Sequence, residues 1–492
     1  MKLVLKSPTR VEIQGDVPAM LLGVIKQDLT YRNKAIQFDI KRLEGQMQYG
    51  GHRAEHLKQE IDELKKKAKV CLLNQDEDGT YWAHGGLVNR LQKHLRCDLE
   101  NKLKYPEAKS LSWSKVPDYQ MYPYQKASFE KLLKERHAGV ELATGLGKTF
   151  IILNLARELG LKTVIMTPSS NISEQIYELF VEHLGKKYVG KYWGGKKEAK
   201  KLIVIGNGQS FTRIVPGSPD WKLLKETQVF MADESHQTPA ETLSKVCTGV
   251  LADSPYRFFF SATQIRNDGL DLLLEGITGP MVHRMTAKEG MDQGYLARLY
   301  FKFIETQSDI GFRSPDVNEM TRKHLYYNPR VNAIAAMIAN AAVASQGHQV
   351  LILIDEIEQF NRIFPLLKHE CRFAHGGTAN ENIPAQFHDS DNVQLVKDFN
   401  AGKFPILIGT SCISTGTDIK AVQTMIRIKG GKSRIEFMQD SGRCTRLYKL
   451  IGKVDCNIFE FDVANVEILS KHTVIRKAIA DEINGPVKTL RF

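Results

Sequence analysis

A glycine-rich loop is the segment of this chain with the clearest chemical potential. Residues 141–149 read Glu-Leu-Ala-Thr-Gly-Leu-Gly-Lys-Thr, after a β-rich run and before an amphipathic stretch. Glycines in such a loop let backbone N–H groups surround phosphate oxygens at a helix N-terminus. Leu142 stands where the common pattern has its first glycine. The loop predicts a nucleoside triphosphate site with Mg²⁺, formed by Thr144, Gly145, Gly147, Lys148 and Thr149.

The two ends of this loop imply separate chemical roles. Lys148 would reach the β- and γ-phosphates, and the Thr149 hydroxyl would ligate Mg²⁺. A second candidate, the acid pair Asp233 and Glu234, follows the apolar run Val229–Ala232. Parallel sheets bind ligands at this strand edge, and two buried acids are costly unless a cation is present. We expect Asp233 to hold Mg²⁺ through water and Glu234 to act as general base on the attacking water.

Short apolar runs separated by helical stretches must position these residues. Such runs imply parallel sheets covered on both faces. They form two sets, before and after Ala287–Arg298, and so predict two α/β lobes joined near residue 298. The runs are Val140–Leu142, Lys162–Thr167, Leu202–Gly206, Val229–Ala232, Phe258–Ser261, Gln349–Ile354, Pro405–Gly409, Met425–Ile428 and Asn457–Phe461.

The first part of the chain has a different pattern. A helix is predicted over His52–Leu72, with one narrow apolar stripe and many charges. This helix either forms a protruding hairpin arm or packs its stripe against a partner helix, or it lies on the surface of its own domain. We divide the chain into an N-terminal substrate-recognition domain, 1–110, and two lobes, 111–298 and 299–492.

Composition narrows the class of protein. With 492 residues, 42% hydrophobic and 25% charged, the chain has the composition of a globular protein of about three domains. Its 7 cysteines form no Cys-x-x-Cys pair, and no run approaches the ~18 apolar residues of a membrane span. We expect a cytoplasmic protein without a signal peptide. The net charge of +12 fits a polyanionic partner, or simply a basic protein.

Together with the glycine-rich loop, seven segments in order resemble the motifs of superfamily 2 helicases and translocases. The resemblance covers about residues 119–462. It implies an α/β fold of two tandem RecA-like parallel-sheet lobes, preceded by a small α+β N-terminal domain. Besides the loop, the segments are Tyr122–Gln125, Thr167–Gln175, Gly206–Ser210, Asp233–His236, Ser261–Thr263, Gly409–Asp418 and Gln439–Arg446.

The family resemblance also implies site residues. Gln125 would recognise adenine, and Asp418 would belong to the nucleotide site. Arg443 and Arg446, with Arg446 the leading candidate for the finger, would stabilise the charge of the phosphoryl-transfer transition state from the facing lobe. The hydroxyls of Thr167, Ser210 and Thr410 would bind nucleic-acid phosphates. Such contacts position a strand without reading its sequence. Thr263 would join them, or would instead hydrogen-bond internally to the acid pair's segment.

The entry motif at Tyr122–Gln125 and two longer segments resemble the group that contains XPB and phage UvsW. The longer segments are Ser261–Gly269 and Tyr81–His94, the latter similar to the end of the small N-terminal domain. The resemblance implies a monomeric, phage-type DNA helicase that uses ATP and Mg²⁺ to remodel branched DNA in recombination and repair. Tyr81, Trp82 and Arg90 would stack at a junction, or pack in the domain core. Alternatives are an RNA helicase, a duplex translocase without unwinding, and an ATP-switched nucleic-acid clamp.

Overall fold

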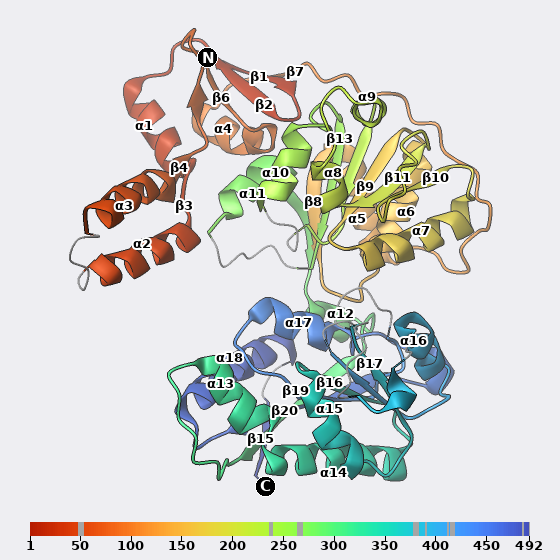
Figure 1. Ribbon diagram of the computed structural model, residues 1–492. Coiled ribbons are helices and arrows are strands. Elements are labelled where there is room, and N and C mark those ends of the chain that lie inside the picture. The colour runs from red at the N-terminus through yellow and green to blue at the C-terminus, as the bar shows by residue number, and fades with distance from the viewer. Residues whose placement is uncertain are drawn as a thin grey trace. The chain divides into compact units, whose positions relative to one another are not determined.

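The chain divides into two compact units in the computed structural model (Figure 1). The first consists of Met1–Leu142 and Gly147–Arg284, and the second of Ala143–Leu146 and Met285–Phe492. Each unit contains a seven-stranded sheet, and every strand pairing with a described register in these two sheets is parallel. The predicted α/β class with two parallel-sheet lobes is therefore confirmed. The structure describes residues 1–47, 54–235, 240–262, 269–376, 383–388, 391–410, 413, 419–484 and 487–491.

The N-terminal part of the first unit is a small mixed domain. Its five-stranded sheet has the order β5-β6-β2-β1-β7, and one face packs with helices α1 and α4 around buried residues such as Leu3, Val11 and Leu91. The bounds are β1 (Lys2–Ser7), β2 (Arg10–Gln14), α1 (Ala19–Asp28), β5 (Asn74–Gln75), β6 (Tyr81–Ala83), α4 (Val88–Leu95) and β7 (Leu99–Asn101).

The predicted charged helix is α3 (Ala54–Ala68), and it packs against α2 (Lys34–Met47) as a helical hairpin (Figure 1). Its apolar stripe meets α2 in a cluster of its own, where Ile40, Leu43 and Ile61 are buried. The hairpin interpretation is therefore correct, although α3 ends at Ala68 because the chain turns into strand β4 (Lys69–Cys71), which pairs with β3 (Thr30–Arg32).

The large sheet of the first unit has the order β10-β11-β9-β12-β13-β8-β14. Its middle strands β9 and β12 are buried at every residue, because helices cover both faces of a central parallel sheet. The strands are β8 (His137–Leu142), β9 (Thr163–Thr167), β10 (Val189–Tyr192), β11 (Ile203–Asn207), β12 (Val229–Ala232), β13 (Tyr256–Ser261) and β14 (Met281–Met285). The helices are α5 (Pro123–Glu135), α6 (Lys148–Leu159), α7 (Ser170–Leu184), α8 (Gly208–Thr212), α9 (Pro219–Lys225), α10 (Ala240–Thr248) and α11 (Asp271–Thr278).

The small domain is attached to the large sheet of this unit through α11. The Arg90 guanidinium binds both carboxylate oxygens of Glu275, at 2.9 and 2.8 Å, and also lies 3.1 Å from Asp28 Oδ1. A Cβ on Gly86 would meet the Glu275 carbonyl oxygen at 2.4 Å, so only glycine permits this approach. Arg90 therefore holds the two parts together, and its predicted alternative role at a DNA junction is not supported.

An extended segment, 105–115, continues from the small domain over the helices of the large sheet. Lys109 N–H donates to Leu159 O at 2.9 Å, and Ser114 N–H donates to His183 O at 2.8 Å. Tyr256 Oη donates to Pro106 O at 3.2 Å. This strap therefore packs on the sheet that carries the glycine-rich loop, on both sides of the predicted domain boundary at residue 110.

The sheet of the second unit has the order β17-β18-β16-β19-β20-β15-β21. Its buried apolar core includes Ile352, Ile408 and Ile426 from three neighbouring strands. The strands are β15 (Arg298–Thr306), β16 (Val350–Ile354), β17 (Cys371–Ala374), β18 (Ile406–Gly409), β19 (Thr424–Ile428), β20 (Asp455–Val463) and β21 (Lys488–Arg491). The helices are α12 (Ala287–Asp292), α13 (Val317–Thr321), α14 (Pro329–Gln346), α15 (Ile357–Ile363), α16 (Asn392–Asn400), α17 (Arg434–Gly442) and α18 (Glu467–Asn484). In the described part of both units, no helix is both long and apolar enough to cross a bilayer.

Candidate nucleotide and nucleic-acid sites

The glycine-rich loop connects strand β8 to helix α6, as predicted. Gly145 and Gly147 have φ angles of +92° and +72°, which a residue with a side chain adopts only with strain. A Cβ on Gly147 would also lie 2.5 Å from Gln125 Nε2. The loop therefore places backbone N–H groups at the start of α6, next to Gln125, while Thr144 is half-buried within it.

Lys148 and Glu234 form an ion pair at the carboxyl end of the sheet. Lys148 Nζ lies 3.1 Å from Glu234 Oε1 and donates a hydrogen bond to Leu142 O at 3.2 Å. The two side chains are only 7% and 17% exposed. Glu234 has φ +46°, a left-handed conformation that costs about 1–3 kcal/mol for a residue other than glycine and is found mostly at functional sites.

Asp233 is buried directly beside this pair. Its N–H donates to Met166 O on β9, and its Oδ1 accepts the Glu234 N–H, both at 2.9 Å. Burial, reinforced by the Glu234 carboxylate and opposed by Lys148, raises the pKa of Asp233 to about 7. A bound cation would remove this penalty, so the acid fits the predicted role in holding Mg²⁺.

Few protein side chains offer oxygen ligands to Mg²⁺ at this site. Thr149 is half-buried in the first turn of α6, and Asp233 lies at the end of β12. The described residues contain no cluster of three or more His, Cys, Asp or Glu side chains able to bind a metal. Mg²⁺ in such a site keeps waters and takes its other oxygens from substrate phosphates.

Gln125 belongs to the entry of α5, where the sequence placed adenine recognition. Its side chain is buried, and Oε1 accepts the Tyr122 N–H at 2.9 Å. Tyr122 is half exposed, and its ring stacks on Tyr124 with the centroids 5.9 Å apart. The structure thus places Gln125 beside Gly147 of the loop. It also places Lys148 beside Asp233 and Glu234.

The predicted arginines lie at the end of α17 in the second unit. Arg443 is buried and follows the last residue of the helix; Arg446 is half-buried one turn later. Burial lowers the pKa of Arg443, and the nearby Asp440 carboxylate opposes this. Thr410 is also buried, at the end of β18, and its N–H donates to Ala374 O at 3.2 Å. Thr263 and Asp418 lie outside the described residues.

A cavity of about 640 Å³ lies at the carboxyl ends of β10 and β11 in the first unit. We call it the strand-end groove. Ser210 lines it, with its Oγ donating to Asn207 Oδ1 at 2.8 Å. Lys196, Lys197 and Arg213 supply positive charge to the same wall. The sequence analysis missed this basic loop, although two glycines followed by two lysines, residues 194–197, were a usable signal.

Thr167 does not face this groove with its hydroxyl. The residue is fully buried at the end of β9, and its Oγ1 hydrogen-bonds to Ser173 Oγ at 2.6 Å and to Ser169 O at 3.0 Å. The expectation of a phosphate contact from Thr167 is therefore not supported, because the hydroxyl orders the turn before α7 instead. Ser170, at the start of that helix, lines the groove in its place.

The fold and the site define a nucleoside-triphosphatase motor with two parallel α/β units. Two family models match the chain: "Type III restriction enzyme, res subunit" over residues 118–266 and "Helicase conserved C-terminal domain" over residues 330–448. The chain belongs to the superfamily 2 helicases, the ATP-dependent nucleic-acid enzymes that carry this pair of domains.

The relatives include proteins with different nucleic acids in their names. The DNA 3'-5' translocase XPB2 of Sulfurisphaera tokodaii is 23% identical over 74% of this chain and 88% of its own. The structure of Saccharomyces cerevisiae Dbp5 bound to RNA and ADP BeF3 matches 75% of this chain and 89% of its own, with TM-score 0.52 and 16% identity. T4 UvsW aligns over 100% of this chain and 99% of its own, at 16% identity and with a TM-score of only 0.43.

Proposed function

We propose that this helicase is a DNA translocase that remodels branched DNA by branch migration, fork regression and strand annealing, in recombination and repair. The main support for ATP hydrolysis is the buried Lys148–Glu234 ion pair beside Asp233. Gln125 lies next to Gly147 of the glycine-rich loop, which also contains Lys148. The choice of DNA is supported by the relative named a DNA 3'-5' translocase, which this chain matches over most of its length.

In this proposal the residues of the first unit bind the triphosphate and prepare water for attack. Lys148 exchanges Glu234 for the β- and γ-phosphates, so that the freed Glu234 carboxylate accepts the proton of the attacking water. Thr149 and Asp233 would hold Mg²⁺, which supplies charge neutralisation on the phosphates when bound. Arg443 and Arg446 of the second unit would stabilise the transition state, and Asp418 would contribute to nucleotide binding.

The nucleic acid would bind through its phosphates at the strand-end groove. Lys196, Lys197 and Arg213 supply positive charge there, and Ser210 a hydroxyl. Contacts of these kinds position a strand without reading its sequence. Thr263 and Thr410 are proposed as the additional contacts from the Ser261–Thr263 and Gly409–Asp418 motifs.

The test is steady-state ATP hydrolysis by the full chain with no nucleic acid, single-stranded DNA, linear duplex, a four-way junction, or RNA. Lys148→Ala is the blank, and retention of most turnover by this variant would contradict the phosphate-loop assignment. Strongest stimulation by the junction is expected. Equal or better stimulation by RNA would reject the DNA assignment, because RNA recognition uses 2′-hydroxyl contacts that DNA cannot offer.

An RNA helicase is the second candidate, since the Dbp5 structure bound to RNA shares the fold. A duplex translocase without unwinding, and an ATP-switched clamp, are separated from branch migration by a strand-displacement assay on the same junction. The translocase would hydrolyse ATP on the duplex without releasing strands. The clamp would hold the junction equally well after Lys148→Ala.

A further inference from the structure

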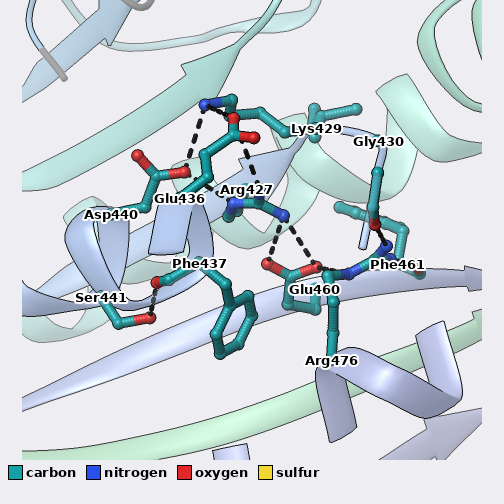
Figure 2. A network of polar contacts seen from close by, with 12 residues as sticks. Arg427, Lys429, Gly430, Glu436, Phe437, Asp440, Ser441, Glu460, Phe461 and Arg476 are labelled. Carbon is teal, nitrogen blue, oxygen red and sulfur yellow. Dashed lines mark hydrogen bonds and ion pairs between the residues drawn. The ribbon is translucent and has the colours of Figure 1, made fainter. Parts of the chain in front are cut away.

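A network of buried charges lies in the second unit (Figure 2). Arg427 on β19 lies at its centre, with its side chain 2% exposed. Its Nε donates to Asp440 Oδ2 on α17 at 2.8 Å, and its Nη1 donates to Glu460 Oε1 on β20 at 3.1 Å. Glu460 Oε2 accepts from Arg476 Nε on α18 at 3.0 Å. The network thus ties α17 to two strands and to α18.

Lys429 extends this network along α17. Its Nζ lies 2.5 Å from Glu436 Oε1 and 3.2 Å from Asp440 Oδ2 (Figure 2). The two acids are four residues apart on one helix, but their environments differ: the Glu436 side chain is 42% exposed and that of Asp440 is 1% exposed. Arg427 and Lys429 therefore share a single buried oxygen of Asp440, whereas Glu436 closes the network at the surface.

Asp440 has a second oxygen that these cations do not use. Among the described residues, its buried Oδ1 has no hydrogen-bond partner. Asp440 lies three residues before Arg443, whose N–H donates to the Asp440 carbonyl oxygen at 3.3 Å. The Asp440 carboxylate and the Arg443 guanidinium also attract each other electrostatically. One carboxylate therefore connects the rigid network to the arginine at the end of the helix.

Stability alone is a poor reason for such an arrangement. Replacing a buried ion network with apolar residues is often neutral or stabilising, because desolvation offsets the attraction between the charges. The effect of this network is geometric: Asp440, in the last turn of α17, contacts both Arg427 and Lys429 through the same oxygen. That turn leads directly into Arg443.

We propose that Asp440 is a positioning residue for phosphoryl transfer, which fixes the end of α17 and thereby the location of Arg443. The proposal rests on the proposed ATPase function. It assigns Asp440 an effect on the rate of the chemical step through Arg443, with no contact to the nucleotide.

Asp440→Asn and Glu436→Gln form a matched pair for the test. Each neutralises one acid of α17 that holds Lys429, but only Asp440 lies next to Arg443. We expect Asp440→Asn to lower kcat by roughly 10- to 100-fold, as small misplacements of catalytic groups do, with the Kd of a fluorescent ATP analogue little changed. Glu436→Gln should retain the wild-type kcat. Urea unfolding of each variant reports whether both are folded.

A double-mutant cycle separates positioning from general destabilisation. Asp440→Asn should have little further effect on kcat in an Arg443→Ala background, because the group it positions is gone. Equal losses in both backgrounds, or a normal kcat for a folded Asp440→Asn variant, would overturn the proposal. Absence of nucleic-acid-stimulated hydrolysis by the wild type, or its retention by Lys148→Ala, would instead overturn the proposed function.

Discussion

Lys148 and Glu234 neutralise each other in the structure. Lys148 has its ammonium group on Glu234 and on the Leu142 carbonyl, so neither buried charge is left alone. An uncompensated buried charge costs several kcal/mol, so the pairing of Lys148 with Glu234 lowers the cost of burying these two groups, while Asp233 keeps a raised pKa. A triphosphate that takes Lys148 therefore also changes the state of Glu234. Binding and activation of the base are linked through one side chain.

The first prediction concerns Glu234. Glu234→Gln removes the base but keeps the size of the side chain and an oxygen that can accept from Lys148. We expect kcat to fall by about 10²–10⁴, the usual contribution of a general base, with ATP binding retained. Single-turnover hydrolysis and binding of a fluorescent ATP analogue measure the two effects. Glu241→Gln, on the exposed first turn of α10, is the control. Normal turnover by Glu234→Gln would show that another group activates the water.

At the scale of elements, sequence predicted the strands that are buried on both faces. β9 and β12 consist only of buried residues, so their apolar runs are visible without any knowledge of their neighbours. β10, β14 and β15 were missed because each mixes polar with apolar residues, and their pairing depends on the rest of the sheet. The apolar stripe of the charged helix does not identify the element that covers it, so the sequence leaves the hairpin undecided; in the structure α2 covers the stripe with Ile40 and Leu43.

The site follows the same division between local and distant signals. The phosphate loop and the acid pair are contiguous, and their spacing alone predicts their chemistry. The network around Arg427 joins residues up to 49 positions apart, and nothing near Arg427 in the sequence marks its partners. Thr167 shows the opposite error, since a motif position gave the residue but not the direction of its hydroxyl.

The second prediction is a pH dependence at the junction of two elements. His137 begins β8, and its Nε2 donates to Ile277 O, in the last full turn of α11, at 2.9 Å. Burial and then the Arg257 guanidinium lower the pKa of His137 from 6.5 to about 3, against the effect of that hydrogen bond. Above pH 6.5 the ring is neutral in both states. As the pH falls below 6.5, the unfolded chain takes up a proton that the folded chain does not, and stability is lost.

From pH 7 to pH 5 this residue should cost at most about 2 kcal/mol of unfolding free energy. His137→Gln retains a donor for Ile277 O but does not titrate, so the variant should lose less stability over the same range. Urea unfolding of both proteins at the two pH values measures the difference, in which other titrating groups cancel. Identical pH profiles would show that the imidazole is charged or accessible in the folded protein.

On the scale of the whole molecule, the N-terminal domain belongs to the unit that contains Lys148, Asp233 and Glu234. Its apolar core is shared with Leu272 and Leu273 of α11, and Arg90 binds Glu275 on the same helix. Helix α11 follows, in sequence, the Ser261–Thr263 segment, which we propose as a contact to nucleic acid. A force on the N-terminal domain would therefore act on α11, the helix that follows this segment in sequence.

The third prediction is that removal of residues 1–103 spares basal ATP hydrolysis but abolishes the preference for branched DNA. This end point keeps the strap, whose Tyr105 ring lies 4.2 Å from the Arg136 guanidinium and whose backbone pairs with α6 and α7. Because the deletion exposes Leu272 and Leu273, both are replaced by Ser in the truncated chain and in a full-length control. Hydrolysis on a four-way junction should then fall to the level on linear duplex for the truncated chain alone. If the truncated chain still prefers the junction, the two sheet-bearing units recognise the branch, and the N-terminal domain has another partner.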